Sequence, residues 1–283
     1  MALFGSDSSS ELPSAPIGYE WAEVMVTVKT YPTPSVRHVE TVCVAGVRLD
    51  QDQSSWIRLY PIPFRLLGGD DQFKKYQLVT VPVRHRPGHD ARPESFTPDL
   101  DNIRLGETVK SDRNWARRAE RMQGLIGQAT VCELIRANRD ARMNEPAPSL
   151  GLIKPRDVTI TITDGKGWTA KQEAKAAAAA EPTLLDEYGA VPTKLEPAPY
   201  EIRFKYRCQD RACRGHDQAL IDWEVGAAAR NWVKRYPADS IPYRLENKWK
   251  QMIDPAHDTY FYVGNQHQHR QSFSVLGVWA PKL

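Results

Sequence analysis

The densest group of reactive side chains in the chain lies just after its two-hundredth residue. Cys208, Cys213 and His216 follow the spacing C-x4-C-x2-H, with Gly215 in the turn between them. Thiolates and imidazoles are preferred ligands of Zn²⁺, and a strand end followed by a tight loop can present several of them together. Three ligands predict a zinc site that needs a fourth, and the sequence offers three distant candidates: His257, His267 and His269.

Two other outcomes are compatible with the same three residues. Water in the fourth position would make the site catalytic, because an open coordination position is what a zinc hydrolase uses. Alternatively the cysteines stay reduced and only shape the loop, or they form a disulfide.

Two carboxylates follow this loop where a helix is expected to begin. Asp222 and Glu224 are two residues apart, on either side of Trp223. On a helix this spacing directs two side chains to opposite sides, so at most one would face a given cleft. Asp222 as an N-cap and Glu224 beside the positive end of the helix dipole would be structural. In a site walled by aromatic rings, one of them would instead be a general base or stabilise a cationic sugar.

Basic side chains gather in a turn at 66–75, in a proline-rich loop at 84–101 and on an expected helix at 111–122. Clustered guanidinium groups bind phosphates, and neighbouring aromatic rings suit stacking on unpaired bases. A solvated basic surface with no partner is the alternative. The nucleic-acid contacts that we predict are Lys74, Lys75, Arg84, Arg86, Arg92, Arg113, Arg117 and Arg121, of which the last three would share one helical face.

The composition excludes some classes of protein. The 283 residues, 41% hydrophobic, are enough for a large core, and a formal charge of +3 requires any polyanion to meet a local patch. No apolar run is long enough for a membrane helix, and the N-terminus lacks the pattern of a signal peptide. Four cysteines without a disulfide framework favour the cytoplasm. We expect no membrane partner, and no obligatory protein partner is evident.

The pattern of apolar residues predicts an α+β fold, mainly an antiparallel sheet with several flanking helices. Expected strands occupy 23–30, 38–50, 55–62, 76–83, 149–164, 200–208 and a closing hairpin near 259–281, and expected helices 111–122, 130–143, 168–180, 222–235 and 242–252. We predict a disordered tail at 1–20, a β-rich domain at 21–180, a linker at 181–199 and an α+β region at 200–283. The alternative is that the two regions pack as one domain.

Several strings resemble one known group of proteins: VETVCVAGV, WIRLYPIPFR, FKKYQ, RPES, and C-x4-C-x-GH with IDWE. Over about Val24 to Pro281, the chain resembles bacterial antiphage DNA glycosylases that remove modified, glucosylated cytosine bases from viral DNA. The glycosylase pattern of a helix-hairpin-helix with a downstream Asp is absent, so no catalytic residue is carried over from the family.

The resemblance implies an N-glycosylase, a hydrolase that flips a modified base out of double-stranded DNA and leaves an abasic site. Under this interpretation Asp222 is the first candidate for the catalytic carboxylate and Glu224 the second, with Asn265 and His267 as partners that position water. Phosphates would be held by Lys74, Lys75, Arg84, Arg86 and Arg92, and a base bearing a sugar would need a wide, polar pocket.

Two further hypotheses belong to different classes. The chain would be a non-catalytic nucleic-acid-binding module if its zinc were purely structural and its basic loop bound the strand. It would be a metal-dependent nuclease or hydrolase if Cys208, Cys213 and His216 left a coordination position open.

Overall fold

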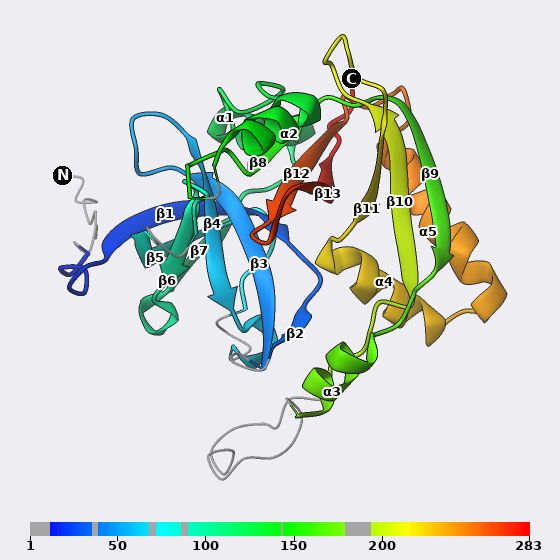
Figure 1. Ribbon diagram of the computed structural model, residues 1–283, viewed down its shortest axis with the longest axis horizontal. Coiled ribbons are helices and arrows are strands. Elements are labelled where there is room, and N and C mark those ends of the chain that lie inside the picture. The colour runs from blue at the N-terminus through cyan, green and yellow to red at the C-terminus, as the bar shows by residue number, and fades with distance from the viewer. Residues whose placement is uncertain (1–11, 36–38, 68–71, 86–89, 143, 179–193) are drawn as a thin grey trace, which may run out of the picture.

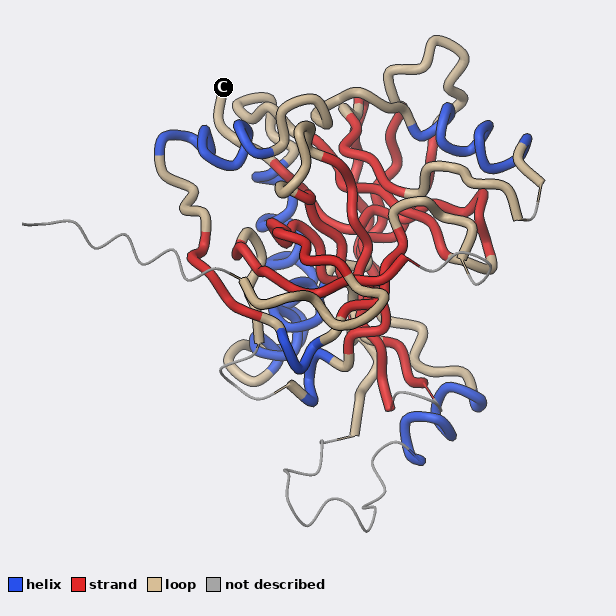
Figure 2. Tube along the Cα trace, turned by 90° about the vertical axis from the view of Figure 1, so that its left-hand side faces the viewer, coloured by secondary structure: helices blue, strands red, loops and turns tan. Residues whose placement is uncertain are grey.

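The computed structural model describes residues 12–35, 39–67, 72–85, 90–142, 144–178 and 194–283 (Figure 1). Its strands form two mainly antiparallel sheets with helices around them, which confirms the predicted α+β class. Figure 2 shows the strands in the middle of the molecule and the helices towards its periphery. Among the described residues, no helix combines the length and the apolar character that crossing a membrane requires.

The N-terminal half forms a closed barrel of five strands. In their order around the barrel the strands are β1 (Glu20–Lys29), β3 (Val39–Arg48), β4 (Ser55–Ile62), β6 (Ser95–Pro98) and β5 (Gln77–His85). Pairing of β5 with β1 closes the ring, and only β4 and β6 run parallel. This is the connectivity of five-stranded Greek-key barrels of the OB type. Two shorter strands extend it, β2 (Thr33–Ser35) on β3 and β7 (Arg104–Thr108) on β5.

Alternation along the strands gives the barrel two apolar faces. Val24 and Val26 of β1 point inward, where they join Ile57 and Leu59 in the barrel core. Met25 lies between those two valines and points outward, into a cluster shared with the second sheet. A strand that is buried on both faces has a nearly continuous apolar sequence, as MVTV in β1 does.

The second sheet carries the C-terminal half. Its order is β8 (Leu150–Ile153), β12 (Tyr260–Gln266), β13 (His269–Trp279), β11 (His216–Leu220), β10 (Tyr200–Arg207) and β9 (Arg156–Asp164). Its barrel-facing side contributes Leu152, Tyr262 and Trp279 to the shared cluster. The two sheets therefore bury a common apolar layer.

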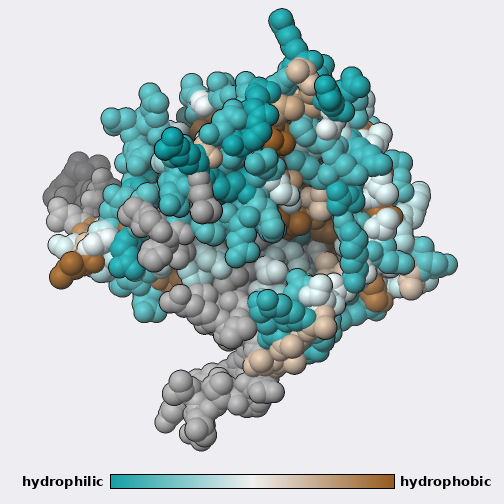
Figure 3. Space-filling view, in the orientation of Figure 1, coloured by the Kyte–Doolittle hydropathy of each residue, from teal (hydrophilic) through white to brown (hydrophobic). Residues whose placement is uncertain are grey.

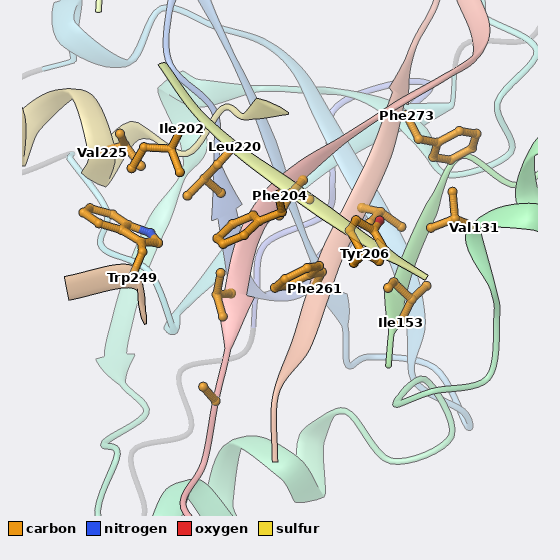
Figure 4. Packing of buried hydrophobic residues seen from close by; sticks show 14 of the residues in the cluster. Val131, Ile153, Ile202, Phe204, Tyr206, Leu220, Val225, Trp249, Phe261 and Phe273 are labelled. Carbon is orange, nitrogen blue, oxygen red and sulfur yellow. The ribbon is translucent and has the colours of Figure 1, made fainter. Parts of the chain in front are cut away.

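Three of the described helices, those that begin at Val131, Trp223 and Ile241, cover the other side of the second sheet. The described helices are α1 (Ala116–Arg121), α2 (Val131–Asp140), α3 (Ala170–Ala178), α4 (Trp223–Val233) and α5 (Ile241–Met252), with 3₁₀ turns at Phe64–Leu66, Leu100–Asn102, Arg113–Trp115 and Ala238–Ser240. Helix α2 packs on β13 and α5 on β9. Beneath them Phe204 and Phe261 stack with ring centroids 4.8 Å apart, beside Tyr206 and Trp249 (Figure 4).

The structure corrects three expectations about local structure. The predicted loop at 84–101 contains β6, and the predicted Cys/His loop continues into β11. Both strands are short and are fixed by partners distant in the sequence, so local periodicity does not show them. The expected helix at 111–122 begins only at Ala116, because Arg113, Asn114 and Trp115 have φ of 48°, 51° and 65°. Arg113 consequently does not share a helical face with Arg117 and Arg121.

Strand β7 is the last strand of the barrel sheet along the chain. Strands β8 and β9 already belong to the second sheet, together with the C-terminal strands. Residues 181–193 of the predicted linker, and residues 1–11 of the predicted tail, lie outside the described residues. Figure 3 shows that the face seen there is mostly hydrophilic, with apolar residues scattered rather than gathered in one large patch.

Candidate metal centre and polar pocket

Three cysteines and one histidine converge next to helix α2. Their ligand atoms, from Cys132, Cys208, Cys213 and His216, all lie within 4.8 Å of one another. His216 Nε2 is 3.2 Å from Cys213 Sγ, 3.4 Å from Cys208 Sγ and 3.6 Å from Cys132 Sγ. The group is a Cys₃His cluster that could hold a metal ion.

Each ligand is fixed by local structure. Cys132 lies in the first turn of α2, where the Thr130 and Glu133 side chains form a capping box. Cys208 follows β10, and its backbone N–H donates to Cys213 Sγ. Asp210, in the loop between these cysteines, accepts from Ala212 N–H and pairs with Arg136 of α2 at 2.7 Å. The loop and the helix are thus tied together around the cluster.

The donor set suits a soft or borderline cation. Burial, reinforced by the neighbouring Cys208 and Cys213, raises the pKa of the Cys132 thiol to about 12. Three thiolates this close repel one another, and a divalent cation is the natural way to neutralise them. Four nitrogen and sulfur ligands match the closed tetrahedral set of a structural zinc site.

The fourth member of the cluster corrects the sequence prediction. It is Cys132, and neither water nor a histidine from the C-terminal segment is needed to complete the set. His267 and His269 line a different cavity, and His257 lines a third one. Cys132 is isolated in the sequence, and only the packing of α2 on β13 brings it to the cluster.

A polar pocket of about 810 Å³ opens where the loop before β6, the end of α2 and the β12–β13 hairpin meet. Its polar lining includes Asp90, Arg92, Asn138, Arg139, His267 and His269. The pocket therefore joins three segments that are far apart in the sequence.

Asp90 and Arg92 form a buried ion pair at the wall of this pocket, with Nη2 and Oδ2 2.6 Å apart. Burial alone would raise the pKa of Asp90, but side-chain and backbone donors of Arg92 hold it well below its usual range. His267 Nδ1 is 3.4 Å from Asp90 Oδ1. A carboxylate with a lowered pKa thus stands beside an imidazole, half of whose side chain is exposed.

The floor of the pocket is a network of buried polar groups. Asn265 Nδ2 donates to Asn138 Oδ1 at 3.2 Å, and Arg92 Nη1 donates to the Asn265 carbonyl at 3.2 Å. Nearby, Glu94 accepts from Ser149 N–H at 2.6 Å, and Arg58 donates to Ser149 Oγ at 3.1 Å. The network links barrel residues to the second sheet, while Asn265 Oδ1 and Arg58 Nε stay buried without a hydrogen-bond partner among the described residues.

The predicted catalytic residues separate into two pairs. Asn265 and His267 belong to the polar pocket and its floor. Asp222 is the N-cap of α4, where it accepts from the Glu224 N–H, and its carboxylate pairs with Lys75 at 2.8 Å. Glu224 itself is exposed. Asp222 lines a separate cavity of about 300 Å³ together with Tyr31, Trp168 and Tyr200.

Charge is concentrated around Asp222. Burial, reinforced by Glu224, raises the pKa of the Asp222 carboxyl, and the Lys75 ammonium opposes this shift. Burial would lower the pKa of Lys75, but Asp222 and Glu224 outweigh it and hold that pKa above its usual range. Burial also lowers the pKa of the neighbouring Lys29 to about 8. These groups join the barrel to α4.

The eight predicted nucleic-acid contacts have different environments. Lys75 and Arg92 are buried in the two ion pairs, and Arg121 is half-buried with its guanidinium bonded to the Arg117 carbonyl. Arg86 lies outside the described residues. The remaining four are exposed: Lys74, Arg84, Arg113 and Arg117.

Sequence reasoning missed Cys132, Asp90 and Asn138. Asp90 could have been predicted from the sequence, because it lies two residues before Arg92 in a loop that is long and highly charged. Asn138 had none, because an Asn near the end of a helix is usually solvated.

Two protein-family models match the chain. Residues 127–283 match the family described as "Domain of unknown function (DUF8757)", and residues 20–124 match "Domain of unknown function (DUF8758)". The division between the matches falls between α1 and α2, after the barrel and before the second sheet. A search of curated proteins found no match to the chain.

Proposed function

The chain belongs to the DUF8757 family, and from its polar pocket we propose that it is a DNA-processing enzyme, an N-glycosylase. It would flip modified bases out of phage DNA and hydrolyse the glycosidic bond, leaving abasic sites as part of antiviral defence. One observation supports this most: a polar pocket of about 810 Å³ whose wall holds an ionised carboxylate next to a histidine.

The size and lining of the pocket suit a flipped, enlarged base. Small-molecule sites usually occupy about 300–1,000 Å³, and this pocket lies in the upper part of that range. A cytosine that carries a sugar offers many hydroxyl groups, and the amides and guanidinium groups of the lining can bond to them. Arg92, in the proline-rich loop, is one of those residues.

The catalytic roles that we propose from the pocket differ from those expected from the sequence. Hydrolysis breaks the bond between the sugar C1′ and the base while water adds to C1′, and positive charge develops on the sugar. Asp90 is placed to stabilise that charge, and His267 to position the water and accept its proton. Asn265 acts through the floor of the pocket as a positioning residue. Asp222 would be a structural group, because it caps α4 and lies outside the polar pocket.

Double-stranded DNA would be held by the exposed basic side chains. Lys74, Arg84, Arg113 and Arg117 can each contact a phosphate without leaving an internal ion pair. Such contacts give affinity without sequence specificity. Specificity would then come from the pocket, as is usual for enzymes that flip bases.

The test is to incubate purified protein with duplex DNA containing cytosine, hydroxymethylcytosine or glucosylated hydroxymethylcytosine. Free base is measured directly, and strands are examined before and after alkali. We expect free base and alkali-dependent breaks from the glucosylated duplex. Direct breaks would mean a nuclease, and no product from any duplex would overturn the proposal.

Two variants locate the reaction. Asp90→Asn and His267→Gln should each lose base release, whereas Asp217→Asn should keep it. Asp217 is a matched control because it is a half-exposed aspartate on β11 that pairs with Arg203.

We further propose that the Cys₃His cluster binds Zn²⁺ and stabilises the fold. Elemental analysis should find one zinc per chain, and Cys132→Ser should release it. Cys43→Ser is the matched control, since Cys43 lies in β3 and outside the cluster. Full zinc retention in Cys132→Ser would overturn this assignment.

A non-catalytic nucleic-acid-binding module is the second candidate function. The closed Cys₃His set favours it over a metal-dependent nuclease, because four protein ligands leave no tetrahedral position for a catalytic water. The barrel connectivity is also common among nucleic-acid-binding modules, an analogy of fold alone. DNA binding without release of base would decide for this candidate. Either function is consistent with the cytoplasm, where all four cysteines would stay reduced.

A further inference from the structure

A second large cavity lies on another part of the molecule. It measures about 920 Å³ and opens between the segment before α1, the end of α5 and residues 280–283, which follow β13. Its walls include Ser111, Trp115, Lys248, Gln251, His257 and Lys282. None of its lining residues lines the polar pocket described above.

One wall of this cavity is a strained turn. Arg113, Asn114 and Trp115 are consecutive residues in the left-handed region, with φ of 48°, 51° and 65°. Arginine and tryptophan rarely adopt this conformation, because their Cβ atoms approach the following carbonyl. Such backbone persists only where the surroundings enforce it, and it clusters at functional sites.

Contacts on both sides of the turn enforce it. The Asn114 side chain accepts from the Lys282 N–H at 2.7 Å and donates to the Lys282 carbonyl. The Trp115 ring lies against Trp279 and Tyr76, with centroids 6.2 and 5.9 Å away. The turn therefore holds Trp115 in place at the wall of the cavity.

The side chains around the cavity favour an anion. Lys248 and Lys282 line it, and within the described part of the chain neither ammonium group forms an ion pair; the Lys248 ammonium lies over the Trp249 ring, 4.7 Å from its centroid. The His257 Nδ1 atom is buried and has no hydrogen-bond partner among the described residues. No Asp or Glu side chain is among the lining residues. Arg113 of the turn and Arg117, two residues after it, are exposed and add positive charge.

We propose that this cavity is a second nucleic-acid site, which binds one nucleotide of a single-stranded segment. Lys248 and Lys282 contact its phosphate, and the base lies against Trp115. Cationic groups beside an aromatic ring are the combination with which proteins hold single strands irrespective of sequence. The inference does not depend on base excision, because it uses none of the residues of the polar pocket.

The test is the affinity of the full chain for a fluorescently labelled single-stranded 12-nucleotide DNA across a range of salt concentrations. The double variant Lys248→Gln, Lys282→Gln is compared with Lys250→Gln. Lys250 is the matched control because it is exposed on the same helix and pairs with Glu246. We expect the double variant to bind at least about tenfold more weakly, with a salt slope smaller by about 0.7 for each phosphate that is no longer neutralised.

An affinity of the double variant within twofold of the Lys250→Gln control would overturn the proposal. Equal thermal midpoints of the two variants show that folding is not the cause of a loss. Competition with dTMP distinguishes a free nucleotide from a strand. If millimolar dTMP displaces the labelled DNA, the site binds a single nucleotide. If binding depends on the two lysines but resists dTMP, the site requires the strand.

Photocrosslinking tests the position of the base. A 12-nucleotide DNA carrying 5-iodouracil should crosslink to the peptide that contains Trp115, and the lysine double variant should lose that crosslink. Crosslinks confined to peptides outside this cavity would contradict the proposed stacking. Base release from duplex DNA is measured separately, so failure of the glycosylase proposal leaves this result interpretable.

Discussion

Two buried ion pairs have the same chemistry in different settings: Lys75–Asp222 joins the barrel to α4, and Arg92–Asp90 lies within the loop before β6. In both Lys75–Asp222 and Arg92–Asp90 each side chain is less than a tenth exposed, with the charged atoms 2.8 and 2.6 Å apart. Yet the pKa of Asp222 is raised and that of Asp90 is lowered. The difference arises because burial dominates at Asp222, whereas several Arg92 donors outweigh burial at Asp90.

The surroundings, more than the carboxylate itself, therefore separate a structural aspartate from a candidate catalytic one. Asp222 caps a helix and pairs with a lysine beside a smaller cavity. Asp90 borders a large polar pocket and stands 3.4 Å from an imidazole. A substrate could meet Asp90 together with a second functional group, and this is what acid–base chemistry requires.

The largest expected effect tests the structural role of the Lys75–Asp222 ion pair. Lys75→Met removes the ammonium and leaves the Asp222 carboxylate buried without its partner, so we expect the free energy of unfolding to fall by about 3–5 kcal/mol. Urea unfolding measures it. The double variant Lys75→Met, Asp222→Leu removes both charges and should recover most of the loss. A double variant as unstable as the single one would show that the ion pair is not the cause.

Asp90→Asn tests the proposed catalytic role of Asp90. It keeps the shape of the side chain and removes its charge, so base release should slow by about a hundredfold or more, as when other electrostatic groups are removed from active sites. The loss of stability should be smaller than in Lys75→Met, because the new Asn oxygen and the Asn265 carbonyl can still accept hydrogen bonds from Arg92. Single-turnover base release and urea unfolding measure the two effects. Normal base release would return the catalytic role to Asp222 or Glu224.

The two aspartates should also affect acid stability in opposite directions. A lowered folded-state pKa means that Asp90 stabilises the fold above its unfolded pKa, and that this contribution disappears as pH falls through the folded-state value. A raised pKa means that Asp222 favours the fold when protonated, so its effect has the opposite sign. Unfolding between pH 7 and pH 2 should show a shallower acid loss in Asp90→Asn than in the native chain. A steeper loss would reverse the assignment.

Local patterns in the sequence predicted much of the fold, and non-local packing supplied the rest. Strand β4 occupies the predicted residues 55–62, because its apolar and aromatic side chains carry the signal themselves. Strand β6 has four residues and exists because β4 and β5 pair with it on either side. Cys208, Cys213 and His216 were recognisable by their spacing, whereas Cys132 joins them only through the packing of α2. Asp90 was not found because its burial depends on segments far away in the sequence.

The smallest expected effect concerns Lys74, which is adjacent to Lys75 but faces the opposite way. Lys74 is exposed, while Lys75 points inward to Asp222. Lys74→Gln should change the free energy of unfolding by no more than about 0.5 kcal/mol, as is usual for surface positions. If Lys74 contacts a phosphate, DNA affinity should fall roughly two- to fivefold and the salt slope by about 0.9, which fluorescence anisotropy at several salt concentrations can measure. An unchanged slope would remove Lys74 from the DNA-binding surface and leave Arg84, Arg113 and Arg117 to form it. A marked loss of stability would instead show that Lys74 is not a simple surface residue. The Lys75–Asp222 ion pair would then depend on Lys74.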